Sequence, residues 1–179
     1  MTPNTLRIAQ ITDIHLTEHD GDTLQGIDTG ESLRQVLTAI GALSPRPSLI
    51  IASGDLVQTA NSNSYNRLKS IFCDINIPVY VLPGNHDDTE MMRQYLAGDS
   101  VKYQSSLDLK GWKILFINST IKHEHHGIVS ETEQALLEIN IGPALNPLVL
   151  VALHHPTINS CPSFSCRLDN KDKFISYLK

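Results

Sequence analysis

The sequence predicts an α/β domain in which short apolar strands alternate with amphipathic helices. Three observations support this class. Apolar runs of strand length recur along the chain, for example at Leu6–Ile11 and Leu148–Leu153. Stretches with helical spacing of apolar residues lie between such runs, and polar or glycine-containing turns follow them. A strand–helix–strand order predicts parallel neighbouring strands with helices packed on the sheet.

The first half of the chain repeats this unit. Its opening strand, Leu6–Ile11, leads directly into Thr12-Asp13-Ile14-His15. The apolar spacing over Glu31–Leu43 predicts a helix, which Pro45 and Pro47 bring to an end. Three further elements are predicted in the same order, namely a strand over residues 49–52, a helix around residues 65–72 and a strand over residues 78–82.

The second half of the chain has a different pattern. Val101–Leu107 and Trp112–Asn118 are expected to form a hairpin around Lys110-Gly111. A His-rich loop follows, and the last predicted elements are a helix over residues 130–139, a strand over residues 148–153 and a helix over residues 170–178. Because no repeat or linker interrupts the chain, residues 1–179 are interpreted as a single domain with two sheets.

The composition excludes several classes of protein. Hydrophobic residues make up 41% of the 179 residues, which is enough for a core and excludes wholesale disorder. The net charge of −5, without a basic cluster, argues against a nucleic-acid binder. No apolar run is long enough to span a bilayer and no secretory leader is recognised, so we expect a soluble, cytoplasmic protein without a membrane partner. Cys73, Cys161 and Cys166 lack zinc-clamp spacing and are expected to be free thiols.

Polar motifs follow four of the predicted strands. They are Asp13-x-His15, Gly54-Asp55, Gly84-Asn85-His86-Asp87 and His154-His155-Pro156. Ligands of open α/β sheets bind at the carboxyl ends of the strands, which is where these motifs are expected. The carboxylate of Asp, the imidazole of His and the carbonyl oxygen of Asn suit manganese, iron or zinc. The four motifs together therefore predict a metal site.

The chemistry of the ligands suggests two ions rather than one. Asp55 has two carboxylate oxygens and can bridge two cations, while Asp13 and His15 share one face if their segment is extended. Two cations about 3.5–4 Å apart would generate a hydroxide near neutral pH and hold the oxygens of an in-line displacement at phosphorus. His86 would then protonate the leaving oxygen. Each motif alone is also typical of an ordinary turn, but four of them in this order favour a site.

These motifs resemble the signature of the calcineurin-like metallophosphoesterase family, and within it the class III branch of 3′,5′-cyclic-nucleotide (cyclic-AMP) phosphodiesterases. The resemblance covers the chain from Leu6 to His155. Further residues that carry it are Leu24-x-Gly26-x-Asp28, Ser53-Gly-Asp-Leu56, Tyr65, Pro78-Val-Tyr-Val81 and His126-Gly-x-x-Ser-Glu131 preceding Gln134. The implied fold is a four-layer αββα sandwich of two mixed β-sheets flanked by helices, with its C-terminal part missing. The implied activity is metal-dependent hydrolysis of a cyclic nucleotide or a related phosphodiester.

The resemblance also implies a role for each motif. Asp13, His15 and Asp55 would hold the first metal ion, and Asp55, Asn85 and His154 the second, with iron and manganese, two manganese ions or zinc as the expected metals. His86 would be the general acid. His15, Asn85 and His86 would contact the substrate, which is a small nucleotide or phosphodiester. The remaining implied residues would support the ligands from behind, namely Asp87, His155 and His126.

Two departures from the family pattern shape the alternatives. The closing Gly-His-x-His block does not occur, so we expect a chain that is truncated relative to the family, and Asn118 stands where the branch usually has Asp. One alternative is therefore a metallophosphoesterase-fold module with little catalysis that serves as a binding surface. Another is a different phosphoesterase, acting on phosphomonoesters, lipid-linked nucleotides or phosphoproteins. The sequence leaves a homodimer open.

Two other groups of polar residues receive simpler interpretations. His123, His125 and His126 are interpreted as a solvated loop, with a second metal site as the alternative. Glu131 and Glu133 are interpreted as first-turn residues of a helix capped by Ser130.

Overall fold

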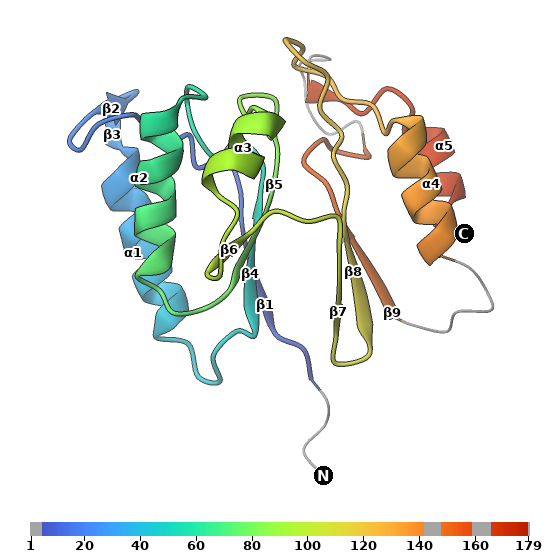
Figure 1. Ribbon diagram of the computed structural model, residues 1–179, viewed down its shortest axis with the longest axis horizontal. Coiled ribbons are helices and arrows are strands. Elements are labelled where there is room, and N and C mark those ends of the chain that lie inside the picture. Colours follow the sequence, from blue (N-terminus) through green and yellow to red (C-terminus); the bar gives the residue numbers. More distant parts are fainter. Residues whose placement is uncertain (1–4, 142–147, 159–165, 179) are drawn as a thin grey trace.

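The structure, a computed structural model, describes residues 5–141, 148–158 and 166–178, and forms four layers in the order helix, sheet, sheet, helix (Figure 1). The elements of the first half are β1 (Ile8–Ile11), β2 (Thr23–Leu24), β3 (Ile27–Asp28), α1 (Thr29–Gly41), β4 (Leu49–Ser53), α2 (Ser62–Cys73), β5 (Val79–Leu82), α3 (Thr89–Tyr95) and β6 (Val101–Lys102). Those of the second half are β7 (Ser106–Leu109), β8 (Trp112–Phe116), α4 (Glu131–Asn140), β9 (Leu148–Ala152) and α5 (Lys171–Ser176). The expected helix-flanked pair of sheets is confirmed.

The two main sheets differ in strand direction. The first has the order β1-β4-β5-β6, and all of its described strands are parallel. The second has the order β7-β8-β9, with β7 antiparallel and β9 parallel to β8. The first sheet is therefore parallel over the described residues, where a mixed sheet was expected, and the second is mixed as expected.

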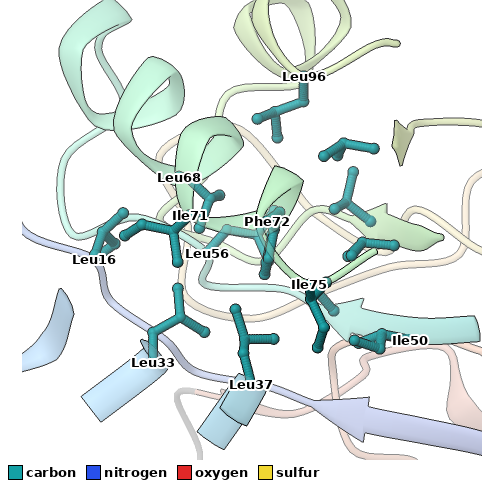
Figure 2. Close-up of a cluster of buried hydrophobic side chains, with 14 of the residues drawn as sticks. Leu16, Leu33, Leu37, Ile50, Leu56, Leu68, Ile71, Phe72, Ile75 and Leu96 are labelled. Atoms are coloured by element: carbon teal, nitrogen blue, oxygen red, sulfur yellow. The ribbon is translucent and has the colours of Figure 1, made fainter. Parts of the chain in front are cut away.

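Three apolar clusters fill the three spaces between the four layers. Because side chains alternate along a strand, successive residues of β4 face different clusters. Ile50, which is labelled in Figure 2, packs with the first helical layer, and so does Ala52. Leu49 and Ile51 pack between the sheets. Residues of β8 alternate in the same way, and Leu115 packs against α4 and α5. Each main sheet thus packs against helices on one face and against the other sheet on its second face.

One predicted strand is divided between the two sheets. Val101–Lys102 pairs with β5 in the first sheet, and only Ser106–Leu109 forms the hairpin with β8. The single strand expected over residues 101–107 is therefore wrong, because residues 103–105 cross from one sheet to the other. The hairpin turn itself lies at Lys110-Gly111 as expected, with φ angles of 50° and 80°.

Most of the helices and strands that the sequence did not predict are short. Helix α3 has 7 residues, and β2 and β3 have 2 each. The sequence does contain a start signal for α3, namely an Asp at position 88. In the structure Asp88 is the N-cap and accepts hydrogen bonds from the backbone of Glu90 and Met91. The cap expected at Ser130 is confirmed by its bond from the Glu133 N–H. In the described part of the chain, every helix is too short or too polar to cross a membrane.

Candidate metal centre

Backbone hydrogen bonds join the loop after β1 to the loop after β4. The N–H groups of Asp13 and His15 donate to the carbonyls of Gly54 and Asp55, at 3.1 and 2.9 Å. A bridge between Leu16 and Val57 continues the parallel pairing beyond the strands. In the sequence Asp55 is far from Asp13 and His15, and this pairing brings the three residues to one edge of the sheet.

Three candidate ligands have the left-handed backbone conformation. The φ angles are 53° at Asp13, 46° at His15 and 50° at Asp55. A residue with a Cβ atom pays about 1–3 kcal/mol for such a conformation, and such residues cluster at functional sites. The expectation that residues 13–15 form an extended segment is therefore wrong, since both ends of the segment turn to positive φ. Asp13 and His15 consequently direct their side chains to different parts of the site.

The ligand atoms form two groups that share Asp55. In one group the atoms of His15, Asp55 and His86 lie within 4.8 Å of one another, and in the other the atoms of Asp13, Asp55 and His154 do so. The two carboxylate oxygens of Asp55 face different groups, with Oδ2 lying 3.5 Å from His15 Nε2 and Oδ1 lying 3.6 Å from His154 Nε2. Asp55 is 5% exposed, so this shared carboxylate is buried between the two groups.

Two of the histidines are oriented through their Nδ1 atoms. His154 Nδ1 lies 3.0 Å from the carbonyl of Ser53, and His86 Nδ1 lies 3.1 Å from the carbonyl of Gln58. A carbonyl only accepts, so Nδ1 carries the hydrogen in each ring and Nε2 is left available. Metal-ligating histidines commonly have this arrangement, in which the second ring nitrogen donates to an oxygen.

Glycine is required at two positions between the loops. A Cβ atom on Gly84 would overlap the backbone nitrogen and Oδ1 of Asp55, and one on Gly54 would overlap the ring of His154. Gly54 also has a φ of 92°. Each glycine therefore lets a candidate ligand come nearer than a side chain would permit.

Asp87 connects the loops after β4 and β5. Its Oδ2 accepts the N–H groups of Leu56 and Gly84, at 3.0 and 2.9 Å. Burial raises the pKa of this carboxyl to about 6, although the two backbone hydrogen bonds act in the opposite direction. Asp87 therefore joins the two loops that carry Asp55 and Asn85.

His155 lies beneath the site. It is 2% exposed, and its Nδ1 lies 2.8 Å from the hydroxyl of the equally buried Ser119. Burial, followed by the neighbouring His154, lowers the pKa of His155 to about 4. His126 lies between two acidic side chains, with its Nε2 3.5 Å from Asp169 and its Nδ1 3.7 Å from Glu124.

The His-rich loop reaches the site through a residue that the sequence did not single out as a site residue. His125 Nδ1 lies 3.3 Å from the side-chain nitrogen of Asn85. Residues 123–125 are exposed, in line with the interpretation as a solvated loop, and the exposed ring of His125 contacts Asn85. The signal for His125 was only its place among the other histidines of the loop, which does not show which ring contacts Asn85.

A cavity of about 440 Å³ opens beside the candidate ligands. Asn85 and His86 form part of its wall, and Thr120, Lys122 and His123 from the loop after β8 form another part. Its volume lies within the usual range for small-molecule sites. The polar atoms at one end of the cavity belong to the candidate site itself.

The model of the calcineurin-like phosphoesterase family matches residues 6–174. The chain belongs to this family. It is 34% identical over 154 residues to a 3′,5′-cyclic-nucleotide phosphodiesterase of Nostoc sp. (86% of this chain, 58% of the relative). It is also 32% identical over 165 residues to a 3′,5′-cyclic adenosine monophosphate phosphodiesterase of Haemophilus influenzae (92% and 59%), and 33% identical over 151 residues to that of Escherichia coli K12 (84% and 55%). The chain thus spans just under three fifths of the length of these curated relatives.

A calcineurin-like phosphoesterase implies two metal ions, and the described residues fit them. The donor set is carboxylate, imidazole and amide, which suits first-row transition metals. His15 Nδ1 is buried and has no hydrogen-bond partner among the described residues, as expected for a ring that needs another group to complete its environment. The shared Asp55 provides one carboxylate oxygen for each ligand group.

Proposed function

We propose that this chain carries the catalytic centre of a metal-dependent phosphodiesterase that hydrolyses a cyclic nucleotide or a related phosphodiester. The observation that supports this most directly is the pair of ligand groups sharing the buried carboxylate of Asp55. The names of the relatives, which are cyclic-nucleotide phosphodiesterases, support the substrate class.

The metal ligands in this proposal are five residues from four strand ends, namely Asp13, His15, Asp55, Asn85 and His154. The two groups seen in the structure divide them differently from the family pattern, since Asp13 lies with His154 and His15 with His86. In both arrangements Asp55 is the shared residue. When bound, the ions supply Lewis-acid activation of a water molecule and of the phosphoryl oxygens. Iron with manganese, two manganese ions and zinc are the metals that we expect.

His86 is the general acid of the proposed reaction. The oxygen of water forms a bond to phosphorus and releases one proton to the solvent. The ester P–O bond breaks with its electron pair staying on the ester oxygen, and His86 gives a proton to that oxygen. The Nδ1–H of His86 is held by the Gln58 carbonyl, and the His86 backbone N–H donates to Asp55 Oδ1 at 2.9 Å. Nε2 is therefore the nitrogen that carries the transferred proton.

The cavity beside the site is the place that we assign to the nucleoside part of the substrate. Asn85 and His86 lie at its wall, so a phosphate near these residues would direct one substituent into it. His15, Asn85 and His86 are then the residues in reach of the phosphate.

The remaining expectations concern the cellular compartment and the oligomeric state rather than the reaction. Cys73 is a free, exposed thiol, which fits a reducing compartment such as the cytoplasm. Cys161 lies outside the described residues. A homodimer stays a prediction.

The test compares Mn²⁺-dependent hydrolysis of 3′,5′-cyclic AMP and of bis(4-nitrophenyl) phosphate by the wild type and Asp55→Ala. We expect the variant to lose at least a hundredfold in rate and most of its bound metal by elemental analysis. A matched control is Asp99→Asn, because Asp99 precedes β6 at the opposite edge of the sheet. Equal rates in wild type and Asp55→Ala would refute the mechanism. A wild type with well under one ion per chain would favour the binding-module alternative.

A further inference from the structure

The amide of Asn85 has one neighbour that favours a single orientation. Its nitrogen Nδ2 lies 3.3 Å from Nδ1 of His125, a residue of the loop after β8. An amide NH₂ group only donates, so the neutral ring accepts this hydrogen bond through Nδ1 and carries its own hydrogen on Nε2. The contact thus defines which end of the amide faces the loop.

The orientation matters because the two ends of the amide are chemically different. Only the carbonyl oxygen Oδ1 has lone pairs for a cation, whereas Nδ2 has hydrogens that would repel one. With Nδ2 directed at His125, Oδ1 is turned to the other side of the amide plane. If nothing held Nδ2, the amide could rotate and present the wrong end for part of the time.

The loop that carries His125 is fixed at its base. Thr120 and Gly127 form a bridge, and the Ile128 N–H donates to the Ser119 carbonyl at 2.9 Å. Gly127 also pairs with the chain near Leu168. The pairing at the base of the loop therefore restricts the position of His125, although its side chain is exposed.

The anchor of the loop is the residue that follows a candidate ligand. The ring of His155 lies so close to Gly127 that a Cβ atom there would overlap its Nδ1, which also contacts the hydroxyl of Ser119. His155 comes directly after His154 in the sequence. Packing thus connects His154, through His155 and the loop, to His125 and the amide of Asn85.

We infer that His125 is a positioning residue, which holds the amide of Asn85 so that its carbonyl oxygen faces the metal centre. This inference rests on the proposed function, because it assumes that Asn85 binds a metal ion. In this inference the function of the His-rich loop is to supply one hydrogen-bond acceptor, the Nδ1 atom of His125. The relevant property of His125 is an acceptor at the position of Nδ1.

The variants follow from this requirement. His125→Ala removes the acceptor, whereas His125→Asn places a carbonyl oxygen at the same distance along the side chain. Glu124→Gln is the matched control on the same loop, because Glu124 contacts His126 rather than Asn85. Removing a residue that hydrogen-bonds to a metal ligand typically weakens metal affinity about 10–100-fold. Because His125 is exposed, we expect an effect at the lower end of this range.

The first measurement is the titration of metal-free protein with Mn²⁺ by calorimetry. We expect about tenfold weaker binding in His125→Ala, recovery to within threefold of wild type in His125→Asn, and no change in Glu124→Gln. Unchanged binding in His125→Ala, or equally weakened binding in Glu124→Gln, overturns the inference. Weakened binding in His125→Asn overturns it as well, because the bulk of the ring would then be the property that matters.

The second measurement does not involve a metal. The side-chain ¹⁵N–¹H resonances of Asn85 in the metal-free protein should shift in His125→Ala and return towards their wild-type positions in His125→Asn. Resonances that stay unchanged in both variants overturn the contact. Asp55→Ala separates this inference from the proposed function. If Asp55→Ala abolishes Mn²⁺ binding and His125→Ala does not alter it, the positioning role alone is wrong, whereas unaltered binding in Asp55→Ala refutes the metal centre itself.

Discussion

The hydroxyl of Tyr65 donates a hydrogen bond to Asp87 Oδ1 at 3.2 Å and accepts one from the backbone N–H of Asp88 at 2.9 Å. Tyr65 is fully buried on helix α2, and burial, followed by the charge of Asp87, raises its pKa well above the ordinary value. The hydroxyl therefore stays protonated and remains a donor. Since Asp87 also binds the loops after β4 and β5, Tyr65 links α2 to both loops of the candidate metal centre.

Replacing Tyr65 by phenylalanine should loosen this link without creating a large cavity. The Asp87 carboxylate loses a donor and the Asp88 N–H loses its acceptor, so we expect the free energy of unfolding to fall by about 1–3 kcal/mol. Urea unfolding followed by circular dichroism measures this change. Tyr95→Phe is the matched control, because among the described contacts the hydroxyl of Tyr95 has no hydrogen bond. Equal losses in both variants would refute the link.

Replacing His86 by glutamine distinguishes a general acid from a metal ligand. If His86 donates the proton, the rate should fall about 10²–10⁴-fold for an ester with a poor leaving group and much less for a nitrophenyl ester, whose leaving group needs little protonation. Parallel rate assays on cyclic AMP and bis(4-nitrophenyl) phosphate test this.

The competing role of His86 follows from its place in one ligand group with His15 and Asp55. A ligand role predicts lower Mn²⁺ content and equal rate losses on both substrates. Elemental analysis of His86→Gln therefore accompanies the rate assays, and equal losses together with metal loss would show that the acid role is wrong.

The sequence predicts the main strands because their apolar runs are long enough to stand out from the background. Leu49–Ser53 is buried throughout, and such a run ends visibly at the first polar residues. Short elements such as β6 depend on which strand they pair with, and this information lies in tertiary contacts rather than in two residues. The predicted strand over residues 101–107 fails for this reason.

For the candidate site, too, some features could be predicted from the sequence and others depend on tertiary contacts. Its residue types and order were predictable, because each motif follows an apolar run. Its local geometry was not, since Asp13 and His15 have positive φ angles and pair with the loop at Asp55, which is distant in the sequence. The ring of His125 was not predictable either, because its contact with Asn85 joins residues 40 positions apart.

Replacing Gly84 by alanine should disturb the shared carboxylate directly. The new Cβ would overlap the backbone nitrogen and Oδ1 of Asp55, neither of which is a flexible chain end. We expect a loss of about 1–3 kcal/mol in the free energy of unfolding and weaker Mn²⁺ binding. Gly98→Ala is the control, since its Cβ would meet Lys69 Nζ at an ordinary 3.5 Å. Calorimetric titration of both variants decides, and an unaffected Gly84→Ala protein would contradict the close approach.

His155 and Asp87, two titratable groups near the site, should make the stability of the metal-free protein depend on pH in opposite directions. The pKa of His155 falls from an ordinary 6.5 to about 4, mainly through burial, so between these values the unfolded chain binds a proton that the folded chain does not. Folded stability is therefore lost as the pH falls from 6.5 to 4. The pKa of Asp87 is raised to about 6, so its contribution is instead lost as the pH rises from 4 to 6.

The difference in free energy of unfolding between the wild type and His155→Asn isolates the contribution of His155 from that of Asp87. His155→Asn keeps a side-chain group near the hydroxyl of Ser119 but removes the titrating ring. At pH 7 the variant should be less stable than wild type, because it loses buried packing. As the pH falls to 4 this deficit should shrink by about 2–3 kcal/mol, because only the wild type must then keep an imidazole uncharged. Urea unfolding at several pH values measures the difference, and a deficit that does not change with pH would mean that His155 is charged in the fold.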